Sequence, residues 1–168
     1  LQELQNSTAT WKFIVSSVPF NVGQTAAMLI GTFLQDSLIT LPGIPERISP
    51  IFATMELADK WCGFPYDAQT VLDHIRDNSI RNVIVLSGDQ HTAAIDDGTN
   101  AGLPEIMAGG LDITNSRIVA LFEAFGLHLW NKGGQGITTN EFNNAFGKIS
   151  VFGADCVRLE LIDEFANK

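Results

Sequence analysis

Asp89 and His91 are the residues best suited to chemistry in this chain. They lie two positions apart in the segment Ser87-Gly88-Asp89-Gln90-His91. Carboxylate oxygen and imidazole nitrogen are common ligands of divalent and trivalent metal ions, and residues i and i+2 after a strand can point into one cavity. The alternative is structural: Asp89 caps the turn through its own backbone, and His91 is a buried, hydrogen-bonded histidine. A tetrapeptide this short leaves both interpretations open.

The residues before this turn predict a strand that positions it. Residues 83–86 (VIVL) form an apolar run of strand-forming residues that meets Gly88 shortly afterwards. Such a run is typical of a strand buried on both faces. Open α/β sheets keep their functional groups just beyond the carboxyl ends of their strands. We therefore expect Asp89 and His91 at a functional edge of a sheet.

The first half of the chain predicts further elements of an α/β fold. Residues 11–18 are rich in aromatic and β-branched residues and predict a strand. Residues 21–50 predict a short helix followed by a long irregular excursion. Apolar residues with helical spacing between positions 68 and 75 predict a helix that Asp67 caps and that residues 77–79 end.

The second half predicts a strand, a helix and a hairpin. Residues 105–108 predict a short strand, and residues 118–130 predict a helix that Asn115 or Ser116 caps. Asp112 and Asn115 are equally consistent with helix capping and with orienting metal ligands. A glycine- and asparagine-rich loop is expected over residues 131–144. Residues 148–152 and 156–162 alternate as an antiparallel hairpin does, with residues 153–155 as the turn.

Composition excludes some classes of protein. The net charge is −9, with 10 basic and 19 acidic residues and no cluster of lysines and arginines. A nucleic-acid surface is therefore not expected unless a bound metal inverts the local field. The most apolar segment, residues 26–34, is far too short to span a membrane. No nucleophile elbow, Walker motif or dinucleotide fingerprint occurs.

Several single residues leave alternatives open. Cys62 and Cys156 form one disulfide or remain free thiols. His74 is expected on the solvated flank of its helix, and His128 is expected to pack between leucines. The chain begins with Leu1 and lacks the features of a signal peptide, so we expect a processed product or part of a longer protein.

The ordered motifs resemble the later half of the PhoD-like alkaline phosphatase and phosphodiesterase family of the metallophosphoesterase superfamily. The matching positions are Asp59, Trp61, Gly63-Phe64-Pro65 and Gly88-Asp89-Gln90-His91. Residues 105–116 and 143–151 resemble two later strands of the family. The resemblance covers residue 55 to the end, with residues 11–20 as an earlier strand. Gln69 stands where relatives commonly carry arginine.

The resemblance implies an α/β fold that is part of a two-sheet sandwich flanked by helices, with four layers in the order αββα. Residues 1–168 would form a single domain, the carboxyl-terminal part of a larger catalytic domain. His91 would bind metal directly and Asp89 would be a ligand or support one. Asp59, Trp61 and Asn115 would line the substrate pocket or support the ligands. Iron and calcium would be the metals, and metal-activated water would attack a phosphate ester.

The resemblance also implies what is missing. Residues 1–60 contain no match to the family's early metal ligands, so the missing amino-terminal half or another chain would complete the site. The chain alone is then expected to be inactive or nearly so. Its location would be periplasmic, extracellular or in the secretory pathway. The alternative function is a non-catalytic binding or scaffold module that retains the fold without a complete metal site.

Overall fold

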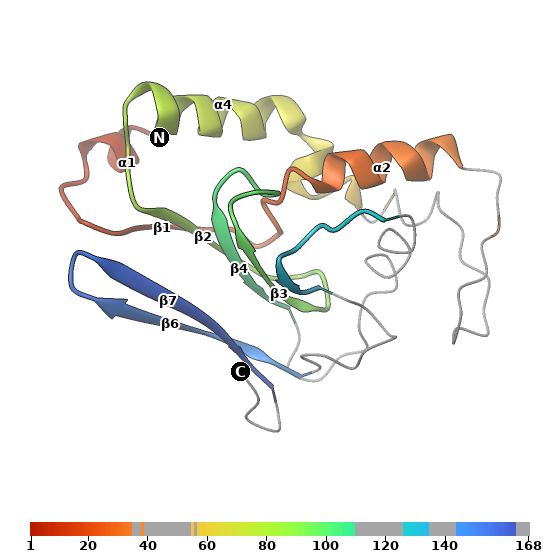
Figure 1. Cartoon of the computed structure of the whole chain (residues 1–168). Helices are drawn as coiled ribbons and strands as arrows, with labels where there is room; N and C mark the ends of the chain where they lie inside the picture. Colours follow the sequence, from red (N-terminus) through yellow and green to blue (C-terminus); the bar gives the residue numbers. More distant parts are fainter. Residues whose placement is uncertain (35–37, 39–54, 56, 110–125, 135–143, 164–168) are drawn as a thin grey trace.

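A computed structural model of the chain describes residues 1–34, 38, 55, 57–109, 126–134 and 144–163 (Figure 1). The described elements combine helices with a multi-stranded sheet, which confirms the α/β class. In chain order they are α1 (Gln2–Asn6), β1 (Lys12–Val15), α2 (Gln24–Phe33), the 3₁₀ helix η1 (Trp61–Gly63), α4 (Pro65–Asp77), β2 (Val83–Ser87), β3 (Ala93–Asp97), β4 (Pro104–Ala108), β5 (Lys132–Gly133), β6 (Phe146–Phe152) and β7 (Cys156–Ile162).

The main sheet has five strands in the order β1-β2-β4-β3-β5. β2 pairs in parallel with β1 on one side and with β4 on the other. β3 runs antiparallel to both β4 and β5. Because β1, β2 and β4 are parallel, their carboxyl ends reach the same edge of the sheet. The predicted functional turn after β2 lies at that edge.

Two apolar cores cover opposite faces of this sheet. Val83 and Val85 of β2 face one core, which they share with residues of α4, and Leu86 packs against the other. The second core joins Ala93 and Ile106 of the sheet to Leu161 of β7. Figure 1 shows α4 and α2 over one face and the β6–β7 hairpin along the other. The strand expected at residues 83–86 is therefore confirmed, and it is buried on both faces.

Three other expectations are confirmed with shifted boundaries. The strand expected at residues 11–18 is β1, and the short helix expected after residue 21 is α2. The expected amphipathic helix is α4, which ends at Asp77 as its sequence indicates. It begins at Pro65, however, so Asp67 lies in its first turn and is not its cap. Proline is favoured at the first helical position because the missing N–H would have no partner there.

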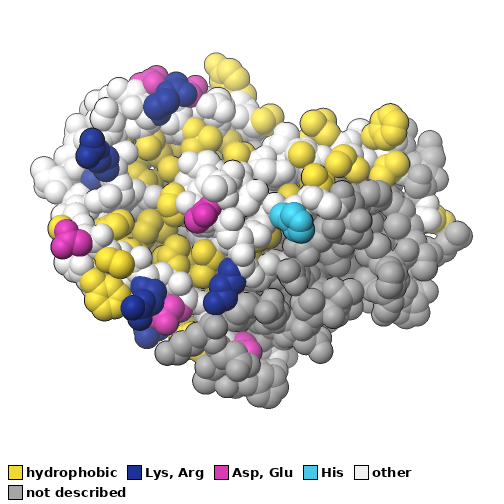
Figure 2. All heavy atoms as spheres, viewed as in Figure 1, with side chains coloured by type: hydrophobic (Ala, Val, Ile, Leu, Met, Phe, Trp, Pro, Cys, Tyr) yellow, Lys and Arg dark blue, Asp and Glu magenta, His cyan; other side chains and the backbone are white. Residues whose placement is uncertain are grey.

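α2 is only partly buried. Gln24, Ala27 and Gly31 face the interior, whereas Phe33 is 87% exposed. Figure 2 shows hydrophobic side chains at the surface in the region of α2, at the upper right of the view. Most of the long excursion expected after α2, up to residue 50, lies outside the described residues.

The hairpin near the carboxyl end is confirmed. β6 and β7 pair antiparallel from Phe146 opposite Ile162 to Phe152 opposite Cys156, with residues 153–155 as the turn. The described residues thus form a helical layer, the main sheet and the hairpin. A second helical layer over the hairpin, which the four-layer sandwich requires, stays a prediction.

Two elements were not expected from the sequence. No element was predicted for residues 93–97, which form β3, since alanine and aspartate are poor strand formers. It forms because all five of its residues pair with β4. β5, only two residues long, lies in the expected glycine-rich loop and pairs with β3.

A helix was expected at residues 118–130. Residues 118–125 lie outside the described residues, and the prediction is wrong for residues 126–130. Residues 126–130 are not helical, because Leu129 and Trp130 are buried beside β5 in an irregular segment. His128 is exposed, so its expected packing between leucines is also wrong. His74 is half-buried rather than on a fully solvated flank. Asp112, Asn115 and Ser116 lie outside the described residues.

The two cysteines are free thiols. Cys62 is buried in η1, and burial raises its pKa to about 11. Cys156 is exposed at the start of β7. No helix in the described ranges is long and apolar enough to cross a membrane.

Leu161→Ala tests how the hairpin is held against the sheet. Leu161 is fully buried between the hairpin and β3. We expect its truncation to lower the free energy of unfolding by about 2–5 kcal/mol, because a cavity replaces the lost contacts. Leu29→Ala on α2 is the matched control at an exposed position and should change it by less than about 0.5 kcal/mol. Urea denaturation measures both, and equal losses would show that the hairpin does not depend on this core.

Candidate functional site

The candidate site lies where the parallel strands end. Ser16 and Ser17 follow β1, Gly88 follows β2, and Gly109 follows β4. A Cβ atom at Gly88 would lie 3.8 Å from the backbone oxygens of Ser17 and Ala108. The three strand ends are therefore close neighbours in space, although they are far apart in the chain.

The turn from Gly88 to His91 has an unusual backbone. The Gln90 N–H donates to the Gly88 carbonyl over 2.9 Å, and Asp89 between them has a φ of 69°. This is the geometry of a tight three-residue turn that is rare for residues other than glycine. His91 also has a positive φ, 51°. Such conformations cost free energy and cluster at functional sites, where surrounding contacts hold them.

Gln90 anchors the turn to α2. Its side chain is buried, and its Oε1 accepts a hydrogen bond of 2.7 Å from Nε2 of the equally buried Gln24. Gly109 N donates to the Thr92 carbonyl just after the turn, over 2.9 Å. The turn is thus bound to α2 on one side and to the end of β4 on the other. Neither glutamine was selected from the sequence, because an amide pair has no spacing pattern.

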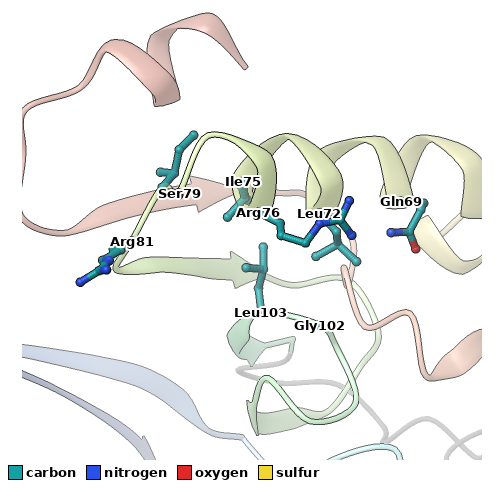
Figure 3. Close-up of a pocket in the computed structure, with 9 residues that line it drawn as sticks. Gln69, Leu72, Ile75, Arg76, Ser79, Arg81, Gly102 and Leu103 are labelled. Carbon is teal, nitrogen blue, oxygen red and sulfur yellow. The ribbon is translucent and has the colours of Figure 1, made fainter.

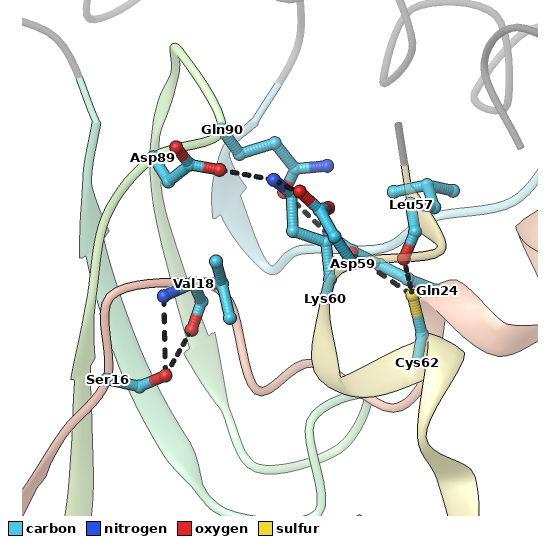
Figure 4. Close-up of polar contacts among 9 residues, drawn as sticks. All are labelled: Ser16, Val18, Gln24, Leu57, Asp59, Lys60, Cys62, Asp89 and Gln90. Carbon is cyan, nitrogen blue, oxygen red and sulfur yellow. Dashed lines mark hydrogen bonds and ion pairs between the residues drawn. The ribbon is translucent and has the colours of Figure 1, made fainter. Parts of the chain in front are cut away.

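Lys60 binds the two carboxylates of the site, Asp89 and Asp59 (Figure 4). Its Nζ forms an ion pair with Asp89 and lies 3.1 Å from Oδ1 of Asp59. The Lys60 side chain is 8% exposed, against 71% for Asp59 and 47% for Asp89. Burial disfavours the ammonium, but hydrogen bonds to Asp89 and Asp59 outweigh it and raise the pKa of Lys60. Lys60 belongs to the Asp59-Lys60-Trp61 motif but was not expected in the site.

Trp61 connects η1 to the end of β1. Its Nε1 donates to Oγ of Ser16 over 3.0 Å, and its ring lies 5.1 Å from that of Phe20. The same region contains a cleft of about 660 Å³. The cleft is lined by Val15, Ser16, Ser17, Val18, Asp59, Lys60, Trp61, Phe64 and Asp67. Asp59 and Trp61 were both expected near a substrate pocket. They border a cleft that lies beside the ion pair between Lys60 and Asp89.

Gly63 allows the chain to make the sharp path from η1 into α4. A Cβ atom at this position would lie 2.0 Å from the backbone oxygen of Ala58, which is a severe clash. Pro65 then starts α4. The Gly63-Phe64-Pro65 motif thus holds Asp59, Lys60 and Trp61 against the strand ends.

His91 is exposed and forms no hydrogen bond or ion pair within the described ranges. The structural alternative for this histidine, a buried and hydrogen-bonded ring, is therefore wrong. The carboxylate of Asp89 pairs with Lys60 and does not cap its own turn. Asn115, also expected near the site, lies outside the described residues.

The donors of the turn fit a metal ion in chemistry but do not complete its coordination. Asp89 already binds a cation, the Lys60 ammonium, and His91 offers an imidazole free of other partners in the described ranges. Among the described residues, no group of three histidine, cysteine, aspartate or glutamate side chains could hold a metal ion. Asp89 and His91 could therefore supply at most two ligands, and a metal site here would need further donors.

Glu105 is a buried carboxyl that the sequence indicated only as part of a strand. Its Oε1 accepts hydrogen bonds from the backbone N–H of Phe20 and from the Ser87 hydroxyl, over 2.9 and 2.5 Å. Burial is the main cause that raises its pKa to about 7, and the charge of Asp96 adds to it, while these hydrogen bonds oppose the rise. Glu105 joins β4, β2 and the segment that leads into α2. The sequence signal that could have indicated a special role for Glu105 is an acidic residue within the otherwise apolar segment PEIMA.

Asp96, opposite Glu105 on β3, has a structural role. Its carboxylate is fully buried and accepts backbone hydrogen bonds from Gly98, Asn100 and Ala101 over 2.8–3.1 Å. The Asn100 side chain adds another at 2.7 Å. These contacts hold the loop between β3 and β4 and leave little of the carboxylate for other partners.

A second cavity, of about 510 Å³, lies at the end of α4 (Figure 3). Two arginines line it, but Arg76 pairs with Asp73 and Asp77, and Figure 3 shows Arg76 and Arg81 pointing in different directions. Their charges do not converge as an anion site requires. The cleft beside Lys60 and Trp61 is therefore the better candidate.

The chain matches the PhoD-like phosphatase family over residues 1–122. It belongs to that family, as the motifs had indicated, and the family supports a phosphatase-type enzyme. The match includes the whole described site and begins at residue 1, whereas the resemblance covered residue 55 onward with residues 11–20 as an earlier strand. The softer resemblance of residues 143–151 lies beyond the matched range. Searches of curated proteins and of solved structures found no match.

Glu105→Gln tests the buried carboxyl through the pH dependence of stability. The folded carboxyl has a pKa of about 7 against 4.5 for the ordinary group, so the folded state binds its proton more tightly. Its contribution to stability therefore falls as the pH rises from about 4.5 to 7, by roughly 3.5 kcal/mol in all at about 1.4 kcal/mol for each pKa unit. In the Glu105→Gln variant, we expect the free energy of unfolding not to show this decline with pH, because glutamine does not titrate.

The measurement is urea denaturation at several pH values between 4 and 8. Glu3→Gln, at an exposed position on α1, is the matched control and should keep the wild-type profile. A Glu105→Gln variant whose stability declines as steeply as the wild type would show that Glu105 does not hold a proton in the folded protein.

Proposed function

We propose that this protein takes part in metal-dependent hydrolysis of phosphate monoesters or diesters, with Asp89 and His91 as metal ligands. The observation that carries the proposal is the place of the Gly88–His91 turn. It lies at the shared carboxyl edge of three parallel strands, beside a cleft, in a chain that belongs to a phosphatase family. Ligand sites of open α/β sheets are typical of this edge.

The side chains around the turn have distinct tasks in this proposal. A carboxylate oxygen of Asp89 and a ring nitrogen of His91 would hold the metal, and iron and calcium are the metals the family resemblance implies. A bound metal ion supplies Lewis-acid chemistry toward a phosphoryl group and its attacking water. The Ser16–Trp61 hydrogen bond orients the indole at the cleft, where it can contact the alcohol part of the ester.

The remaining ligands would come from outside the described residues. An amino-terminal half of the catalytic domain outside these 168 residues, or another chain, is the proposed source, and Asn115, which lies outside the described residues, is a further candidate. The ligand count supports this, because the described residues contain no group of three donors. Without those ligands, we expect little or no turnover of p-nitrophenyl phosphate or its diester by the 168-residue chain, even with metal added. Family analogy favours a protein outside the cytoplasm.

A non-catalytic binding module is the second candidate. The observation that favours it is the Lys60–Asp89 ion pair, which neutralises one proposed ligand. A protein that retained the fold and lost its metal would gain from such a pair, since the Lys60 ammonium, on a side chain that is 8% exposed, would be costly to leave unpaired. Metal content separates the two candidates.

His91→Ala is the test of the metal site. After incubation of the chain with iron or calcium and removal of free metal, elemental mass spectrometry measures bound metal. We expect bound metal in the wild type and at least about a tenfold loss of affinity in the variant, because one of few ligands is gone. His128→Ala, which also removes an exposed imidazole, is the matched control and should keep the metal.

Metal bound equally by wild type and His91→Ala would contradict the ligand role of His91. No metal in any sample would favour the non-catalytic module. Rapid turnover of p-nitrophenyl phosphate by the isolated chain would contradict the need for further ligands.

A further inference from the structure

Lys60 has two carboxylate partners that differ in their surroundings. Asp89 is half-exposed and lies in the constrained turn after β2, whereas Asp59 is mostly exposed and directly precedes Lys60 in the chain. Nζ contacts both at once. The ammonium can therefore give up one carboxylate and keep the other with only a small side-chain movement.

A metal ion and the Lys60 ammonium cannot share the Asp89 carboxylate without cost. Two cations on one carboxylate repel each other, and the repulsion is less screened by water on the side of Lys60, which is 8% exposed, than on the side of Asp89, which is 47% exposed. The Lys60 side chain is also too buried to leave for bulk solvent easily. Asp59, with its Oδ1 already 3.1 Å from Nζ, is the nearest compensating charge.

We infer that Lys60 is an internal competitor of the metal ion: it pairs with Asp89 in the metal-free protein and shifts to Asp59 when a metal binds Asp89. The inference rests on the proposed function, in which Asp89 is a ligand. It assigns Lys60 and Asp59 opposite effects. Lys60 lowers metal affinity by occupying the ligand, and Asp59 raises it by holding the displaced ammonium.

The test measures Ca²⁺ binding to the full 168-residue chain by isothermal titration calorimetry. We expect Lys60→Met, which keeps much of the buried side-chain volume, to bind Ca²⁺ at least about tenfold more tightly than wild type. Lys60→Arg keeps the cation and should stay close to wild type. Asp59→Asn should weaken binding severalfold, because Lys60 then has only Asp89 as its partner.

Charge-matched controls separate this competition from the general attraction of an acidic protein for cations. Lys12→Met removes a lysine from β1, and Asp155→Asn removes a carboxylate from the hairpin turn. Both should bind Ca²⁺ as the wild type does. The inference would be overturned if Lys60→Met bound Ca²⁺ with the same affinity as Lys12→Met. It would also be overturned if Asp59→Asn bound Ca²⁺ with the same affinity as Asp155→Asn. The absence of Ca²⁺ binding in both the wild type and Lys60→Met would overturn it as well.

Asp89→Asn distinguishes a failure of this inference from a failure of the proposed function. If Asp89→Asn leaves Ca²⁺ binding unchanged, Asp89 is not a ligand, and the proposed function and the inference both fail. If Asp89→Asn abolishes binding while Lys60→Met binds as Lys12→Met does, the ligand assignment holds and only the role of Lys60 is wrong. Circular dichroism of each variant verifies the fold. Should Lys60→Met not fold, the opposite shift expected of Asp59→Asn still decides the question.

Discussion

The parallel pairing of β2 with both β1 and β4 is the constraint on which the rest of the structure depends. It brings three strand ends to one edge of the sheet, so that segments far apart in the chain become neighbours there. The close approach at Gly88, with Ser17 on one side and Ala108 on the other, shows how little space separates them. The apolar sequence of β2 makes this arrangement possible, because both of its faces are buried by separate cores.

Polar groups that reach the buried side of this edge must find partners, since an unpaired polar group inside a protein is costly. Two pairs meet this requirement in part, whereas Gln90 Nε2 and Glu105 Oε2 are buried without a hydrogen-bond partner among the described residues. Gln24 and Gln90 form a neutral amide pair that fixes the position of the turn without altering its charge. Lys60 and Asp89 form a charged pair, which leaves the proposed ligand neutralised. The glutamine pair therefore fixes the position of the turn, whereas the Lys60–Asp89 pair affects whether Asp89 can bind another cation.

Local patterns were sufficient for the elements that dominate the fold. The apolar run of β2, the helical spacing in α4 and the alternation in the hairpin each follow from the sequence because their residues have strong intrinsic preferences. β3 could not be found in this way. Its alanines and aspartates are poor strand formers, and only pairing along the whole length of β4 makes it a strand. The start of α4 was misplaced for a smaller reason, since Pro65 itself begins the helix and Asp67 does not cap it.

The sequence by itself determined the family, the α/β class and the turn that carries Asp89 and His91, because these depend on short motifs and local periodicity. Only the tertiary structure decided what surrounds the turn. Lys60 meets Asp89 across 29 positions of the chain, and Glu105 meets Phe20 across 85. Such contacts depend on how packed elements align in space, and no spacing within the sequence encodes them. The charge that Asp89 faces is therefore a property of the packing of η1 against the sheet edge.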